Sequence, residues 1–160
     1  MYVLPVGNNA DEILPGLWLG NAKASQDLKF LKEKNIKAIF NCTKDIPFAP
    51  IQANKYRVPV DDNLQSAEIR NMELWSFEII AKLAKERRQG NAVLVHCAAG
   101  MQRSAAVVAM YLIATQQISK DEAIKQIRQK RPIAFMPMAN FGNSITGFER
   151  TLVKLLLQRI

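Results

Sequence analysis

The sequence predicts a single α/β domain with a central, mostly parallel sheet of about five strands flanked by helices. Short apolar runs typical of buried strands alternate with longer segments in which apolar residues recur at helical spacing. The length of 160 residues suits one compact domain over residues 1–160. Hydrophobic residues make up 49% of the chain and charged residues 22%, which is ordinary for a domain that builds one core.

The first part of the chain is expected to contribute two strands and a helix. Apolar residues on both sides of a Pro-Gly pair indicate two short strands within residues 13–20. Ser25 is expected to cap a helix that runs to about Lys34, because serine is a preferred N-cap residue. Leu28 and Leu31 would then lie on the inner side of this helix.

The middle of the chain is expected to form two strands and one long helix. Apolar runs predict a buried strand over 36–42 and another short strand over 56–60, and the proline-containing segment 43–54 between them predicts a loop. Apolar residues follow helical spacing over 67–88, and Gly90 is expected to terminate this helix.

The last part of the chain is expected to form a fifth strand and three helices. A strand over 93–96 precedes a loop and a long apolar helix. The stretch from Ser119 to Glu122 has the pattern of a capping box and opens a helix that closes before Pro132. A final helix is predicted over about 139–158.

The segment 93–104 has the arrangement that an anion site requires. The first N–H groups of a helix have no partner within it, and the positive end of the helix dipole lies there. A loop wrapped over that end adds further N–H groups, so the backbone alone can hold a phosphate. Ala98, Ala99 and Gly100 suit this loop because small side chains allow close approach and Gly100 can take a positive φ.

Cys97 and Arg103 turn this cradle into a candidate reactive site. We expect the N–H groups and Arg103 to lower the pKa of the Cys97 thiol, which would make it a strong nucleophile. Arg103 can reach back over the loop, where its planar guanidinium fits two phosphate oxygens. The hydroxyl of Ser104 could point at the sulfur and ease its departure.

Each of these residues alone has an ordinary explanation. A lone cysteine after a strand is usually a small buried hydrophobe, a lone arginine is usually solvated, and His96 alone would be a hydrogen-bonded core residue. Their conjunction at fixed offsets, after a strand and before a helix, favours the catalytic interpretation.

Residues 96–104, His-Cys-Ala-Ala-Gly-Met-Gln-Arg-Ser, resemble the H-C-x-x-G-x-x-R-S signature of cysteine-dependent protein tyrosine phosphatases. The rest of the chain resembles their small dual-specificity branch: residues 12–22 are similar to its opening strands, and 140–141 with 148–149 to its closing helix. The resemblance implies a phosphatase-like fold and hydrolysis of phosphotyrosine and phosphoserine or phosphothreonine through a phosphocysteine. His96 would support a substrate-binding loop made of Ala98, Ala99, Gly100, Met101, Gln102 and Arg103.

Two adjacent carboxylates are candidates for the acid that protonates the leaving oxygen. Asp61 and Asp62 follow a strand whose carboxyl end should share a crevice with Cys97. The residues alone leave both open, and adjacent aspartates after a strand are also typical of a turn or cap. The resemblance of residues 58–63 to the family's strand-to-loop segment implies Asp62.

Cys42 ends a strand that is expected to neighbour the strand of residues 93–96. Some relatives hold a cysteine in a comparable strand that pairs with the nucleophile on oxidation, so the resemblance implies Cys42 as a possible redox partner of Cys97. A buried core cysteine is the simpler alternative.

The formal net charge of +8 is compatible with phosphorylated or nucleic-acid partners. Phosphorylated proteins are the expected substrates. Nucleic acid is possible but not favoured, because no aromatic residues alternate with the basic ones. The basic residues gather in two helical stretches, which we interpret as solvated helix faces. These are Lys82, Lys85, Arg87 and Arg88 in the first, and Lys120, Lys125, Arg128, Lys130 and Arg131 in the second.

Several other classes are disfavoured. Two cysteines cannot form a disulfide framework, and no membrane span, signal peptide or lipidation motif is evident, so a reducing, intracellular location is expected, in the cytoplasm with the nucleus as the alternative. No residues have metal-ligand spacing, so we expect neither metal nor cofactor. An RNA 5′-triphosphatase and an inactive phosphate-binding module remain alternatives, although inactive modules usually lack the nucleophile or the arginine. Nothing indicates the oligomeric state.

Overall fold

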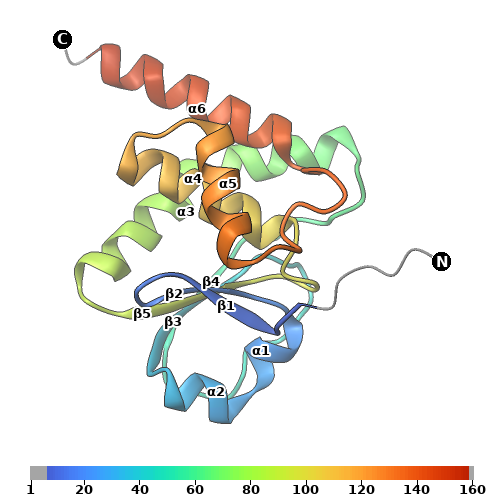
Figure 1. Cartoon of the computed structure of the whole chain (residues 1–160), viewed down its shortest axis with the longest axis vertical. Helices are drawn as coiled ribbons and strands as arrows, with labels where there is room; N and C mark the ends of the chain where they lie inside the picture. Colours follow the sequence, from blue (N-terminus) through green and yellow to red (C-terminus); the bar gives the residue numbers. More distant parts are fainter. Residues whose placement is uncertain (1–6, 159–160) are drawn as a thin grey trace.

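The computed structural model describes residues 7–158, which form one five-stranded mixed sheet with helices on both faces (Figure 1). The strand order is β1-β2-β5-β3-β4, and only β1 runs antiparallel to its neighbour. The mostly parallel sheet predicted from the sequence is therefore confirmed. The strands are β1 Ala10–Leu14, β2 Leu17–Gly20, β3 Ile36–Asn41, β4 Asn54–Arg57 and β5 Ala92–His96.

The helices lie in two unequal layers. Two short helices cover one face of the sheet, and four longer helices stack on the other (Figure 1). No helix among residues 7–158 combines the length and apolar character needed to cross a bilayer. The short helices are α1 Ala22–Gln26 and α2 Leu28–Glu33, and the longer ones are α3 Ser66–Arg88, α4 Arg103–Gln116, α5 Lys120–Lys130 and α6 Gly142–Leu157.

Strand β5 and helix α4 form the centre of the molecule. β5 lies between β2 and β3, and its residues from Val93 to His96 are buried. Every residue of α4 from Ser104 to Ile113 is buried as well, because this helix is apolar on all sides and packs against α3, α5 and α6. The loop between β5 and α4 is therefore anchored at both ends in the core.

The segment after β2 differs from the predicted single helix. Asn21 caps α1 by accepting a hydrogen bond from the Ala24 N–H, and Asp27 caps α2. The prediction that Ser25 is the cap was wrong: Ser25 lies inside α1 and donates to a backbone carbonyl. Leu31 is buried as expected, whereas Leu28, at the first position of α2, is 48% exposed, so the prediction that Leu28 lies on the inner side was wrong.

Two further boundaries moved. Strand β4 ends at Arg57 rather than continuing to residue 60, and Pro59 within that stretch has no N–H to donate to a ladder. Helix α6 begins at Gly142 rather than at 139, because the preceding residues bond to the loop after β5, as described below. The long helix α3 and the Ser119-capped helix α5 are confirmed.

Candidate active site

The backbone carbonyls of residues 97–101, in the loop between β5 and α4, all accept hydrogen bonds from other parts of the protein. The Cys97 carbonyl lies 3.3 Å from Nδ1 of His96, and the Ala98 carbonyl accepts from the Ala22 N–H at 3.0 Å. At the far end of the loop, the Met101 carbonyl accepts from the Phe135 N–H at 2.8 Å. The two carbonyls between them are bound by one arginine.

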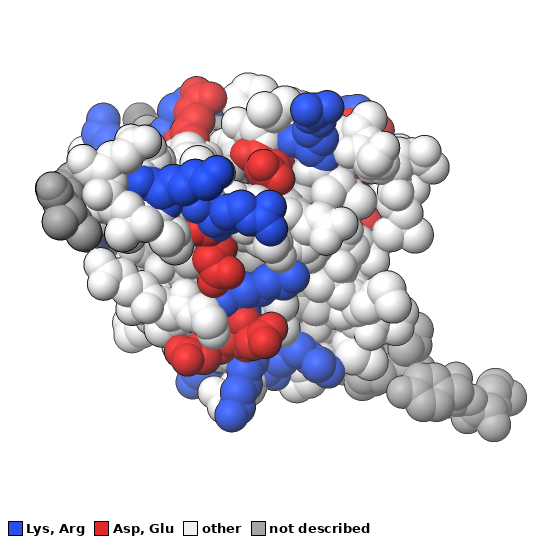
Figure 2. All heavy atoms as spheres, turned by 90° about the horizontal axis from the view of Figure 1, so that it is seen from above, with Lys and Arg blue, Asp and Glu red and all other residues white. Residues whose placement is uncertain are grey.

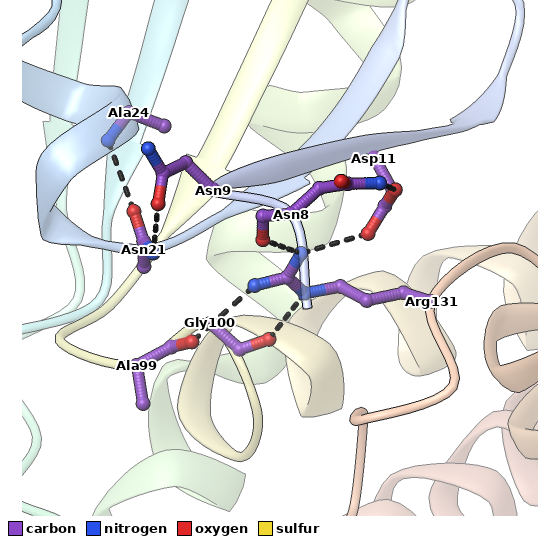
Figure 3. Close-up of polar contacts among 8 residues, drawn as sticks. All are labelled: Asn8, Asn9, Asp11, Asn21, Ala24, Ala99, Gly100 and Arg131. Atoms are coloured by element: carbon purple, nitrogen blue, oxygen red, sulfur yellow. Dashed lines mark hydrogen bonds and ion pairs between the residues drawn. The ribbon is translucent and has the colours of Figure 1, made fainter. Parts of the chain in front are cut away.

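Arg131 is that arginine (Figure 3), and it is fully buried. Its Nε donates to the Gly100 carbonyl at 2.8 Å and its Nη2 to the Ala99 carbonyl at 3.3 Å. Its Nη1 donates to the Asn8 carbonyl at 2.7 Å and to the Asp11 carboxylate at 2.8 Å. The interpretation of Arg131 as part of a solvated basic face was therefore wrong. It ties the site loop to the N-terminal strand.

The hydrogen bonds to these carbonyls also fix the direction of the loop's N–H groups. In a planar trans peptide the C=O and the following N–H point in opposite directions. Because each carbonyl of residues 97–101 is bonded to a neighbouring group, the N–H of each following residue, 98–102, points away from that group. No hydrogen bond to another described residue uses these five N–H groups. Five successive backbone donors without a protein partner are suited to bind an anion.

Gly100 is required at its position in this loop. Its φ is +67°, which is unfavourable for any residue with a Cβ. A Cβ there would also lie 2.5 Å from the Gly20 carbonyl oxygen. The predicted positive φ is confirmed, and the close approach of strand β2 adds a second reason for glycine.

Cys97 is the first residue of this loop and is 2% exposed. Its Sγ is 3.0 Å from Oγ of Ser104, which is fully buried in the first turn of α4. The structure thus brings together the predicted nucleophile and the hydroxyl, which lie seven residues apart in the sequence. A hydroxyl at this distance can donate to a sulfur anion.

Arg103 joins the loop to the segment that follows β4. One guanidinium nitrogen donates to the Val60 carbonyl at 3.0 Å. Its Nε is buried and has no hydrogen-bond partner among the described residues. The guanidinium of Arg103 is therefore held by one hydrogen bond and keeps its Nε–H for a ligand. The same hydrogen bond links the loop to Val60, which directly precedes the two aspartates.

The two aspartates have different partners. Asp61 pairs with Lys44 at 3.0 Å, and its backbone N–H donates to Glu68. Asp62 is exposed, and its Oδ1 accepts from the side chain of Asn140 at 2.9 Å. Asp61 is thus engaged in an ion pair with a cation, whereas the hydrogen-bond partner of the Asp62 carboxyl is a neutral amide.

His96 and Cys42 lie in the core beneath the loop. Burial lowers the pKa of His96 to about 4, so the ring is neutral near pH 7 and Nδ1 donates to the Cys97 carbonyl. Cys42 follows β3, the direct neighbour of β5, and is fully buried. Burial raises the pKa of the Cys42 thiol well above its usual range, and the nearby Cys97 raises it further.

Charges on the α6 side do not gather into one basic surface. Seen from above the view of Figure 1, lysines and arginines alternate with aspartates and glutamates in a band across this face, with uncharged surface beside it (Figure 2). Mixed signs are typical of solvated helix faces. This face therefore does not form a continuous basic surface for nucleic acid.

Comparisons with known proteins give a consistent assignment. The family model described as dual specificity phosphatase, catalytic domain, matches residues 17–151. The chain is 35% identical over 144 residues to human dual specificity protein phosphatase 6, an alignment that covers 88% of this chain but 36% of that protein. The chain therefore spans little more than a third of this relative.

Solved structures agree with the sequence comparison. The crystal structure of human DUSP28 superposes with a TM-score of 0.81 at 27% identity, covering 94% of this chain and 99% of that chain. A mouse protein described as a dual specificity phosphatase complexed with zinc tungstate superposes with a TM-score of 0.81 at 26% identity, covering 98% and 96%. Sheet, loop and family model thus point the same way, and this chain belongs to the family of dual specificity phosphatase catalytic domains.

Proposed function

We propose that this protein hydrolyses phosphotyrosine and phosphoserine or phosphothreonine in proteins through a phosphocysteine intermediate. The observation that carries the proposal is the loop of residues 97–103, in which the N–H groups of residues 98–102, directly after Cys97, have no hydrogen-bond partner among the described residues while the carbonyls of residues 97–101 are bonded. A dianionic phosphate fits such a set of donors without a metal ion. The name shared by the curated relatives supports the dual specificity.

In the first step the Cys97 thiolate attacks phosphorus in line with the leaving oxygen. The loop N–H groups and Arg103 stabilise charge on the three equatorial phosphate oxygens. Asp62 gives its proton to the leaving alkoxide or phenoxide. The products are a phosphocysteine, a free hydroxyl on the substrate and the Asp62 carboxylate.

In the second step water hydrolyses the phosphocysteine. Asp62 now acts as the base that removes a proton from the attacking water. The S–P bond breaks as the new O–P bond forms, and the Ser104 hydroxyl, 3.0 Å from Sγ, stabilises the departing sulfur anion. Inorganic phosphate leaves, and the original protonation states return.

A substrate panel with a nucleophile variant tests this proposal. Wild-type protein and Cys97→Ser are compared on a phosphotyrosine peptide, a phosphothreonine peptide, 5′-triphosphate RNA and an inositol phospholipid. We expect phosphate release from both peptides by the wild type and none by Cys97→Ser, which should still bind the phosphotyrosine peptide. Undiminished release by Cys97→Ser would refute the mechanism. Turnover of RNA alone would favour the triphosphatase alternative.

We also propose that Cys42 protects Cys97 from irreversible oxidation. Peroxide would convert the Cys97 thiolate to a sulfenic acid, and attack by the Cys42 sulfur would form a disulfide with release of water. The position of Cys42 beside β5 supports this role. Peptide mapping after peroxide treatment should find a Cys42–Cys97 link, and its absence would refute the proposal. A reducing, cytoplasmic compartment suits such a thiol.

A further inference from the structure

The side chain of Gln102 bonds the site loop to the segment between α5 and α6. Its Nε2 donates to the Met136 carbonyl at 3.0 Å and to the Met138 carbonyl at 2.8 Å. Its Oε1 accepts from the Asn140 N–H at 2.8 Å. The side chain is turned to this segment, and Gln102 is 6% exposed.

Asn140 extends this connection to the acid. Its backbone N–H is held by Gln102, and its side-chain Nδ2 donates to Oδ1 of Asp62 at 2.9 Å. Three segments far apart in the sequence therefore form one chain of hydrogen bonds, from the phosphate loop through Asn140 to the carboxyl group of Asp62.

A capping or packing role does not account for Gln102. It occupies the N-cap position of α4, yet its side chain makes no capping hydrogen bond to that helix. A buried amide is costly unless its polar atoms are paired. All partners of this amide lie in one short stretch, and that stretch ends on the residue that contacts Asp62.

We propose that Gln102 is a positioning residue that acts through Asn140 to hold the Asp62 carboxyl at the phosphate loop before substrate arrives. The proposal rests on the function proposed above and extends it to a class of substrate. A poor leaving group, such as the alkoxide of phosphoserine or phosphothreonine, depends most on a well-placed acid. A good leaving group depends on it least. Gln102 therefore favours phosphate esters of weakly acidic alcohols.

The test compares leaving groups. Gln102→Met keeps the length of the side chain and removes its hydrogen bonds, and Asn140→Ala breaks only the last link while retaining the backbone N–H that Gln102 binds. We measure kcat/KM for phenyl phosphate and for p-nitrophenyl phosphate, whose leaving group is far more acidic. Both variants should lose about tenfold more activity on phenyl phosphate. An equal loss on the two substrates would overturn the proposal.

A double-mutant cycle with the acid removes the remaining ambiguity. In an Asp62→Asn background, Gln102→Met should lower kcat/KM for phenyl phosphate less than about twofold, because the side chain it positions can no longer give a proton to the leaving oxygen. A loss as large as in the wild-type background would mean that Gln102 shapes the phosphate loop instead. If the wild type releases phosphate from neither substrate, the proposed function itself is rejected. The role of Gln102 is tested separately, by the losses of kcat/KM that its variants show in an active enzyme.

Discussion

Replacing Arg131 by methionine should destabilise the fold and disorder the phosphate loop together. The change removes a fully buried guanidinium that donates to three backbone carbonyls and to Asp11. Breaking a buried ion pair by removing one partner costs about 3–5 kcal/mol. The Asp11 side chain keeps 14% exposure and can recover some water, so we expect the lower end, roughly 3 kcal/mol. That is a large part of the ~5–15 kcal/mol by which domains are stable.

Urea unfolding followed by tryptophan fluorescence measures this loss, with Lys130→Met as the matched control. Lys130 is the adjacent residue, carries the same charge and is exposed, so its replacement should change stability by no more than about 0.5 kcal/mol. For Arg131→Met, a loss of roughly 3 kcal/mol corresponds to a fall in Tm of about 6–12 °C.

Activity separates the loop effect from the stability effect. At a temperature where Arg131→Met remains folded, the carbonyls of Ala99 and Gly100 have lost their hydrogen-bond donor. The N–H groups that follow them, those of Gly100 and Met101, are then no longer fixed in direction. We expect kcat to fall at least about tenfold, since a single oxyanion donor is worth about a hundredfold or more. A variant as stable as Lys130→Met, or one with wild-type kcat, would refute this account of the loop.

Three further predictions concern titration and backbone geometry. His96 is the protein's single histidine, and its lowered pKa implies that folding stability is lost as pH falls from 6.5 towards about 4. Its NMR signals should titrate near pH 4. A titration midpoint near 6.5 would contradict the burial of the ring. Burial acts to raise the pKa of Glu86, but hydrogen bonds from Tyr56 and two asparagines outweigh it and lower that pKa below 4.5. The stability advantage of wild type over Glu86→Gln should therefore shrink in urea titrations below pH 4.5, and a constant difference would contradict this. Gly100→Ala should cost more than about 1 kcal/mol and impair turnover, because its φ is positive and the added Cβ meets the Gly20 carbonyl; a neutral effect in both assays would show that the loop can rearrange.

The loop of the candidate active site could be predicted from local sequence. Residues 96–104 are contiguous, and a strand, a small-residue loop and a helix start are each recognisable from neighbouring residues alone. The placement of Cys97 against Ser104 and the positive φ of Gly100 followed from this. The choice of Asp62 over Asp61 came from family resemblance, and the ion pair of Asp61 with Lys44 is consistent with it.

Errors arose where a side chain's role depends on distant partners. Arg131 looks like any basic residue at a helix end, and its burial is explained only by distant acceptors, in the loop after β5 and in Asn8 and Asp11 near the start of the chain. Ser25 is a good cap by residue type, but Asn21 and Asp27 occupy the positions where free N–H groups begin.

The sequence by itself determined the α/β class, the order of the elements apart from the division of the first helix into two, and the loop that carries the chemistry, because periodicity and motif spacing are properties of neighbouring residues. Only the tertiary structure decided how that loop is held and how the acid is placed. A buried polar group is stable only when its partners are present, and the partners of Arg131, Gln102 and Asn140 come from segments that folding alone brings together.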